Sequence, residues 1–569
     1  MPADTLTKAV PIAVALRPPD QVMRLGRMGA MFQTRLSFMR SLIRRMAAER
    51  WTFERRCFDI DDTGFGVAIY VVHTPERTYS LIAFAHDLPP EQRTDRVIAE
   101  AWDATFNLFD GVPTDADIDR LRLVTPKQEA GRFSDKELVL ARANKSLRLF
   151  DHVVARLADG RQPDIGMLVD VGYLMRTTAV YGNGKFGCAD RSKIADRPEM
   201  RTAFQAEMLT VYLVRLFTVD LVEHIARGQG GAGAVGLSPP IRCFLGIGNA
   251  TGLGMAPFLV SHPVLTHNWV LARETALARA RGIDPVPLSS VSALRRLTDL
   301  AAVYVDEWVV EDALQTERIA ELCRDIGRLR DHISIDACFN RPAAIDALYR
   351  WGENDLSVEG QELLVSILLE PFGDQIDDLC HAMQADVTDS WDPVMSIATL
   401  RSNLQAAFAW ALAIDFASPQ STKRFWYYSD EKLEPRFGDR TTEPGAEHEM
   451  PIAVARDVAR LDAALADVDP AATVAEFVMR NPEHRFAIRR VQTAARYPYA
   501  EIRDNLIDAN CRPIDMLRFK LALFGAGKYD PKSSLWTRIT LFQGAPFPED
   551  LSSADADDWL FPIRPEAEA

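Results

Sequence analysis

The chain has 569 residues, a net charge of −15 and 25% charged residues, a composition typical of a globular protein that buries a large core. The acidic balance argues against a general nucleic-acid-binding protein, because such proteins need a basic face to neutralise phosphates. Its seven cysteines form no CxxC pair, which excludes a disulfide framework and a zinc finger. No run of about 18 uncharged apolar residues predicts a membrane-spanning helix. We therefore expect a cytoplasmic protein that binds neither nucleic acid nor membranes.

The first part of the chain predicts helix, then sheet. Residues 20–50 are rich in methionine, leucine and arginine, and they predict a helix. Residues 51–87 predict three strands of an antiparallel meander, because runs of β-branched and aromatic residues are separated by turn residues.

Helices are then expected up to residue 160. The segment 93–109 carries apolar residues at helical spacing. Residues 134–160 predict one long helix, which Ser134 caps, with Glu137 three residues later, and which Gly160 ends.

The middle of the chain combines a buried helix with glycine-rich segments. Residues 199–227 predict a long apolar helix, and residues 241–248 predict a short buried strand. From 264 to 415 the pattern is almost entirely helical, without a fixed-period repeat. Residues 420–450 predict a long polar and aromatic loop, and loops of that length are usually functional or disordered.

The last part predicts a helical block from 451 to 520, then a strand at 536–542 that we expect to join the N-terminal sheet. The expected fold class is α+β and predominantly α-helical: a large helical body with a small antiparallel β-sheet near the N-terminus. We place the divisions at 1–160 for the N-terminal α+β region, 161–450 for the helical body with two glycine-rich polar loops, and 451–569 for the C-terminal helical region.

The first candidate site is the segment RTTAVYGNGKFGCADR, which begins at Arg176 and ends at Arg191. Both guanidinium groups can bind a carboxylate or phosphate, and Asp190 can orient one of them. Glycines flank Lys185, so its ammonium need not be shielded by neighbouring side chains. The alternative is an ordinary charged surface loop.

Tyr181 and Lys185 share the YxxxK spacing of short-chain dehydrogenases. That family carries the pair on a helix, whereas glycines lie between the two residues here. We therefore do not assign the chain to that family.

The second candidate is GIGNATGLG, from Gly246 to Gly254. A strand before a glycine-rich turn and a helix start predicts backbone N–H groups that bind an anion. It is not a dinucleotide fingerprint, because Thr251 stands where the third glycine belongs. Tight packing without a ligand is the alternative. The residues in question are Asn249, Thr251, Gly252 and Gly254.

Two further groups of residues complete the predicted site. His262 and His267 follow the second segment, and either can act as a general acid–base near neutral pH. A core or capping histidine is the more common case. Lys423 and Arg424 lie beside aromatic residues and would add positive charge to an anion pocket, although a salt-bridged surface explains them equally well.

These patterns favour an enzyme that acts on a small anionic metabolite, by lyase or transferase chemistry. Arg176, Asn183, Asp190, Arg191 and the backbone of 249–254 would bind the substrate. Lys185 or Tyr181 would exchange a proton, partnered by His262 or His267. Lys185 could instead form a Schiff base if burial lowered its pKa.

Two other functions stay open. A cofactor-bearing oxidoreductase would use a flavin, haem or metal, with His484, or Asp378 and His381, as candidate ligands. A non-catalytic helical assembly or regulatory protein would leave the two glycine-rich loops apart or filled by their own side chains. The sequence names no cofactor and leaves homo-oligomerisation open.

Overall fold

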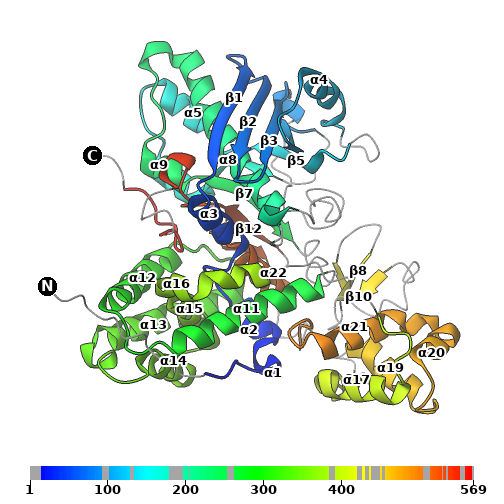
Figure 1. The fold of residues 1–569 in the computed structure, drawn as a ribbon. Coiled ribbons are helices and arrows are strands. Elements are labelled where there is room, and N and C mark those ends of the chain that lie inside the picture. Colours follow the sequence, from blue (N-terminus) through cyan, green and yellow to red (C-terminus); the bar gives the residue numbers. More distant parts are fainter. Residues whose placement is uncertain are drawn as a thin grey trace. The chain divides into compact units, whose positions relative to one another are not determined.

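The chain folds into two units, each assembled from segments that are distant in the sequence (Figure 1). We call them the sheet unit (Gln33–Thr251, Ser292–Ser334 and Leu521–Ala569) and the helical unit (Met1–Phe32, Gly252–Val291 and Ile335–Lys520). The structure, a computed structural model, describes residues 14–92, 101–127, 134–177, 197–200, 202, 204–252, 262–383, 391–418, 426–429, 435–437, 449–451, 455–503, 513–527, 529–533, 536–551 and 558–566.

The sheet unit contains a mixed sheet of nine described strands, in the order β1-β2-β3-β4-β5-β6-β7-β12-β11. Strands β1 to β6 run antiparallel to one another in sequence order, whereas β6 and β7 are parallel. The strands are β1 (Thr52–Ile60), β2 (Gly66–His73), β3 (Thr78–Ala85), β4 (Ala104–Asp110), β5 (Glu137–Lys145), β6 (Tyr173–Thr177), β7 (Gly246–Gly252), β11 (Asp530–Ser533) and β12 (Trp536–Leu541).

Helices cover both faces of this sheet (Figure 1). The described helices that lie wholly or mostly in the sheet unit are α3 (Phe38–Ala48), α4 (Asp115–Val124), α5 (Phe150–Ala158), α6 (Ile165–Val171), α8 (Gln205–Gly230), α9 (Pro239–Phe244), α12 (Leu288–Asp306) and α13 (Ala313–Ser334).

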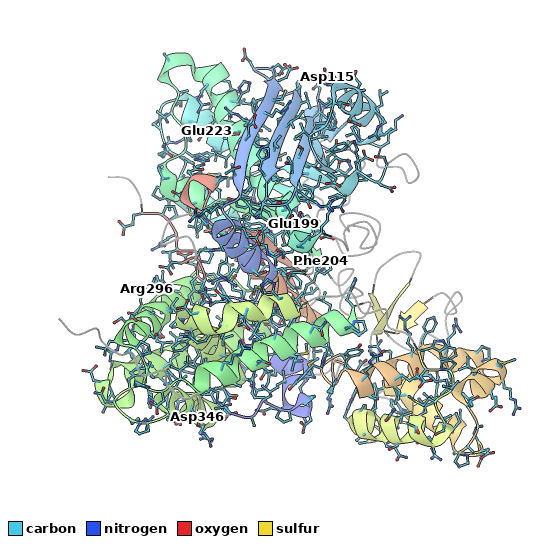
Figure 2. All side chains as sticks on the ribbon, viewed as in Figure 1. Asp115, Glu199, Phe204, Glu223, Arg296 and Asp346 are labelled. Carbon is cyan, nitrogen blue, oxygen red and sulfur yellow. The ribbon has the colours of Figure 1, made fainter. Side chains whose placement is uncertain are left out.

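Different helices pack on the two faces of the sheet. On one face, Phe106 of β4 meets Phe217 of α8 edge to face, with ring centroids 5.5 Å apart. On the other face, Leu121 of α4 packs into a core cluster that includes Ile82 and Phe109. We call these the α8 face and the α4 face. Figure 2 shows Asp115, at the start of α4, beside the strands.

The capping residues at both ends of α6 determine where β6 begins. Asp164 caps α6 by accepting a hydrogen bond from the Met167 N–H at 2.9 Å. Gly172 ends the helix in the left-handed conformation, with φ of 79°, and β6 begins at the next residue. A side chain at Gly172 would also crowd Thr540 and Gln543, so this turn requires glycine.

The predicted small antiparallel sheet is wrong, because the sheet is large and mixed and draws strands from both ends of the chain. Two of its strands, β4 and β5, lie inside the predicted helices 93–109 and 134–160. Both form ladder hydrogen bonds with neighbours on either side, and these tertiary contacts outweigh the local helix preference. The Ser134 N–H does bond the Glu137 carboxylate, as a helix cap would, but Glu137 starts a strand.

Other predictions for the sheet unit are confirmed or corrected in part. The meander at 51–87 is β1 to β3, and the predicted C-terminal strand is β12, in the same sheet. The predicted buried helix is α8. The predicted strand 241–248 is wrong over its first half, because Pro239–Phe244 forms α9 and the strand runs from Gly246 to Gly252.

The helical unit packs α11 against α14, α15 and α16. Its described helices are α1 (Pro19–Val22), α2 (Leu25–Gly29), α11 (Pro263–Arg281), α14 (Ala344–Asp355), α15 (Val358–Leu369), α16 (Gly373–Ile376), α17 (Ile397–Leu412), α19 (Ala455–Leu465), α20 (Val474–Arg480), α21 (Arg485–Arg496) and, for most of its length, α22 (Pro513–Phe524). The predicted loop 420–450 contains strands of a small antiparallel sheet: β8 (Trp426–Ser429), β9 (Pro435–Phe437) and β10 (Glu449–Pro451). Among the described residues, no helix has the length and apolar character needed to cross a bilayer.

Candidate functional site

The first glycine-rich segment begins on β6, and most of the second, predicted as a turn after a strand, itself forms the neighbouring strand β7. Arg176 on β6 pairs with Gly248 on β7, and the two strands run in the same direction. The carboxamide of Asn249 donates a hydrogen bond to the carbonyl of Thr177 at 3.0 Å. The carboxyl ends of both strands therefore lie at one end of the sheet, which is where α/β sheets commonly bind ligands.

Close packing explains two glycines of the second segment. A Cβ atom at Gly246 would collide with the carbonyl of Leu541 on β12, and one at Gly248 would collide with the ring of Tyr173 on β6. Both glycines thus let β7 fit between its neighbours. Tight packing without a ligand, the alternative given in the sequence analysis, explains these two positions. Ligand binding by the backbone after Gly248 stays a prediction.

The structure describes part of the predicted site. Arg176 ends up partly buried on β6, and Asn249 is 1% exposed on β7. Thr251 and Gly252 are the last residues of β7. Eight of the predicted site residues lie outside the described residues: Tyr181, Asn183, Lys185, Asp190, Arg191, Gly254, Lys423 and Arg424.

A row of polar side chains lies on the α4 face of β4, β5 and β6. In the antiparallel ladder, residues that pair directly share a face, and so do alternate residues of one strand. Thr105 pairs with Phe84 of the core cluster and with Arg142, so all three lie on the α4 face. We call the whole set the polar patch, and its residues are Thr105, Asn107, Arg142, Asn144 and Arg176.

The polar patch is largely buried. Thr105, Asn107 and Asn144 are 1%, 0% and 2% exposed, and both arginines are partly buried. Asn144 pairs directly with Arg176 across the ladder, and its side-chain oxygen accepts a hydrogen bond from the Asp103 N–H at 3.0 Å. Such burial of polar groups is costly unless they have partners.

Asn107 stands out within the polar patch. Neither its amide oxygen nor its amide nitrogen has a hydrogen-bond partner within the described part of the chain. The Thr125 hydroxyl, at the end of α4, is also fully buried and has no hydrogen-bond partner within those residues. Thr125 lies one helical turn after Leu121, which packs on the α4 face, so its side chain points to the same side.

The charge of the polar patch is positive. Its five side chains include the guanidinium groups of Arg142 and Arg176, and the buried carboxylate of Asp103, just before β4, lies beside Asn144 and accepts a hydrogen bond from the Lys145 N–H at 2.9 Å. The Arg142 guanidinium stacks over the ring of Trp102, 5.1 Å from its centroid. Burial lowers the pKa of Arg142, but arginine starts so high that it stays charged near neutral pH. In a protein of net charge −15, this is a local attraction for an anion.

A histidine that the sequence analysis did not single out borders the polar patch. His86 follows β3, and its Nε2 lies 2.8 Å from the Thr105 hydroxyl. Burial lowers the pKa of His86, so its imidazole is neutral at pH 7 and able to accept a proton.

Sequence reasoning missed the polar patch except for Arg176, because β4 and β5 were predicted as helices. A signal was present as a short alternation of polar and apolar residues in each strand. Polar residues occupy every second position, at 105 and 107 in one strand and at 142 and 144 in the next, with apolar residues between them. That period of two is typical of strands.

The two predicted histidines belong to the helical unit. His262 precedes α11, and its carbonyl accepts a hydrogen bond from the Thr266 N–H at 3.0 Å. His267 is 8% exposed, and its Nδ1 accepts a hydrogen bond from the Tyr499 N–H at 3.0 Å. Burial lowers the pKa of His267 to about 4, so the ring is neutral at pH 7 with its proton on Nε2. Its role in acid–base chemistry stays a prediction.

The helical unit also contains a buried group of ion pairs. Glu362 is fully buried and accepts hydrogen bonds from Arg17 at 2.7 Å, Arg27 at 2.8 Å and Arg273 at 2.7 Å. Arg17 also binds both oxygens of Glu274 at 2.7 Å. The arginines and the two glutamates thus neutralise one another, which is typical of a structural ion-pair network.

Two acidic residues that could contribute to a metal site, Asp378 and Glu199, have partners within the protein. Asp378 forms an ion pair with Arg279 at 2.6 Å. Glu199, labelled in Figure 2, accepts a hydrogen bond from the Tyr79 hydroxyl. Across the described ranges, no group of three or more histidine, cysteine or acidic side chains is arranged to hold a metal ion.

Comparison with known proteins adds no relatives. No protein-family model matches the chain. No curated protein and no solved structure matches it at a significant level.

Proposed function

We propose that this protein is an enzyme that binds a small carboxylate- or phosphate-bearing metabolite on the polar patch and acts on it by acid–base chemistry, of the lyase or transferase type. The observation that carries the proposal is the buried amide of Asn107, which has no hydrogen-bond partner among the described residues and lies on a sheet face that also presents two arginines. A folded protein rarely leaves such a group unpaired, so an external partner accounts for it best.

Each residue has a part that follows from its chemistry. Arg142 and Arg176 bind the anionic group, because a guanidinium makes charge-assisted hydrogen bonds to carboxylates and phosphates. Neutral His86 accepts a proton. Lys185 and Tyr181, which follow β6 in the sequence, remain candidates for the opposite proton transfer.

The binding test uses the full-length chain with phosphate, sulfate, malonate and succinate, followed by thermal shift and calorimetry. Arg142→Met and Arg176→Met should each weaken anion binding by about tenfold or more, because a hydrogen bond to a charged group contributes about 1.5–3 kcal/mol. Arg55→Met is the matched control: Arg55 lies on β1 of the same sheet and stacks over Phe58 at 5.1 Å, as Arg142 does over Trp102.

The control variant should bind anions like wild type. If no anion binds, or if all three variants bind equally well, the proposed function is wrong. The anions that bind are then incubated with wild type and with His86→Gln, and proton NMR follows product formation. Conversion by wild type alone supports acid–base chemistry at His86, and equal conversion by both excludes that role.

A further inference from the structure

We infer that the ligand of the polar patch carries, besides its anionic group, an uncharged amide-like edge with one hydrogen-bond donor beside one acceptor, and that Asn107 binds this edge. The inference rests on the proposed function, because it assumes that the polar patch is the binding site. It adds the substrate class: an anion with a carboxamide, or with the equivalent edge of a heterocycle.

The first argument is the chemistry of Asn107. A carboxamide presents an oxygen acceptor and an N–H donor in one plane, so it pairs best with a group that offers the reverse. Both atoms lack a partner within the described residues, and the side chain is 0% exposed. Leaving each atom unpaired costs stability, and a ligand with both functions removes both costs together.

The second argument is the surroundings of Asn107. Its ladder neighbours are Ile82 on β3 and Leu140 on β5, and Phe109 lies two residues along the same strand. These side chains are apolar, and the charge of the diagonal neighbour Arg142 is assigned to the anionic group of the ligand. The edge that Asn107 binds is therefore neutral, and the Thr125 hydroxyl on α4 is available as a third hydrogen-bonding group.

The third argument is spacing. Arg142 pairs directly with Thr105, so it is the diagonal neighbour of Asn107. Diagonal neighbours in an antiparallel pair lie about 7–8 Å apart. A small half-amide of a dicarboxylic acid spans such a distance, with its carboxylate on the arginine and its amide on Asn107.

The test measures two pairs of ligands by calorimetry with the full-length chain. Succinamate is compared with monomethyl succinate, which lacks the N–H donor. Nicotinamide mononucleotide is compared with nicotinic acid mononucleotide, which has a carboxylate in place of the carboxamide. We expect wild type to prefer the amide member of at least one pair by about tenfold or more, as a two-hydrogen-bond contact provides.

Variants separate this inference from the proposed function. Asn107→Leu and Asn107→Asp should both abolish the preference, and Asn354→Leu, on the surface of the helical unit, should keep it. Asn107→Asp preserves the side-chain shape and therefore tests the inference even if the leucine variant folds poorly.

Two outcomes would overturn the inference. Equal affinity for both members of each pair, with binding still dependent on Arg142 and Arg176, means that only water satisfies Asn107; the proposed function then survives. If no probe binds and the arginine variants behave like Arg55→Met, both proposals fail.

Discussion

At the scale of single residues, burial decides what a polar side chain can do. Asn107 and His267 are both enclosed, yet Asn107 has no hydrogen-bond partner among the described residues, whereas His267 accepts one from Tyr499. The hydrogen bond to His267 stabilises the fold, whereas the lack of one at Asn107 is the observation on which the proposed binding site rests. The sequence identified His267 by its residue type, but the type alone could not distinguish these cases.

The buried His267 predicts a pH dependence of stability. Its pKa in the folded protein, about 4, lies below the ordinary value of about 6.5, so the unfolded chain takes up the proton first as the pH falls. The contribution is complete above about pH 6.5 and is lost toward pH 4. We expect the free energy of unfolding to fall by about 2 kcal/mol between pH 7 and pH 5 on this account.

Urea unfolding at both pH values checks this. His267→Asn keeps an acceptor for the Tyr499 N–H and should remove that part of the pH dependence, while the exposed His73→Asn should leave it unchanged. An unaltered pH dependence in His267→Asn would contradict the assignment.

At the scale of elements, one buried arginine fixes the start of β7. Arg215 on α8 is 1% exposed and donates to the carbonyls of Leu245 at 2.7 Å, Ala545 at 2.8 Å and Cys243 at 2.7 Å. Its guanidinium also stacks on Phe547, 4.1 Å from the ring centroid. Burial lowers the pKa of Arg215 to about 10, so it stays charged at neutral pH. These contacts hold β7 against the loop after β12.

Arg215→Met should therefore destabilise the sheet unit by about 3–5 kcal/mol, because several buried carbonyls lose their donor. Arg227→Met, on the same helix, removes only an exposed pair with Glu223 and should cost less than about 0.5 kcal/mol. Denaturant unfolding measures both. Similar stability of the two variants would show that the carbonyls find other donors.

At the scale of the whole molecule, the two units differ in how their buried charged side chains are paired. The polar patch of the sheet unit is largely buried and includes two arginines, whereas buried Arg17 and Arg273 of the helical unit form ion pairs with Glu274 and Glu362. The three arginines around Glu362 hold the pKa of that carboxyl well below its usual range, against the opposing effect of burial. Its stabilising effect is present above the unfolded pKa of about 4.3 and is lost as the pH falls further.

Glu362→Gln should destabilise the helical unit by about 3–5 kcal/mol at pH 7, because two buried arginines, Arg17 and Arg273, and the partly buried Arg27 lose a counter-charge. Asp378→Asn, which breaks an exposed pair with Arg279, should cost under about 0.5 kcal/mol. Hydrogen exchange locates the effect: α11 and α15 should lose protection while β2 and β3 keep theirs. Unchanged protection of α11 and α15 would contradict the prediction.

The sequence by itself determined the elements whose local pattern agrees with their final surroundings. Strands β2 and β3 are rich in β-branched and aromatic residues and are bounded by turn residues, and α8 is apolar around most of its circumference. Composition and turn residues therefore suffice to predict these elements. It also determined that Arg176 precedes a glycine-rich polar segment.

Only the tertiary structure decided β4, β5 and the polar patch. The apolar spacing of those segments fits a helix as well as a short strand, and hydrogen bonds to the neighbouring strands decide in favour of strand. The pairing of Arg176 with Gly248 likewise depends on the tertiary structure, because α8 and α9 lie between β6 and β7 in the chain and their packing brings the two strands together. A residue's position in sequence does not specify its neighbour across a ladder, and for that reason Asn107 and Arg142 were found only once the strands were paired.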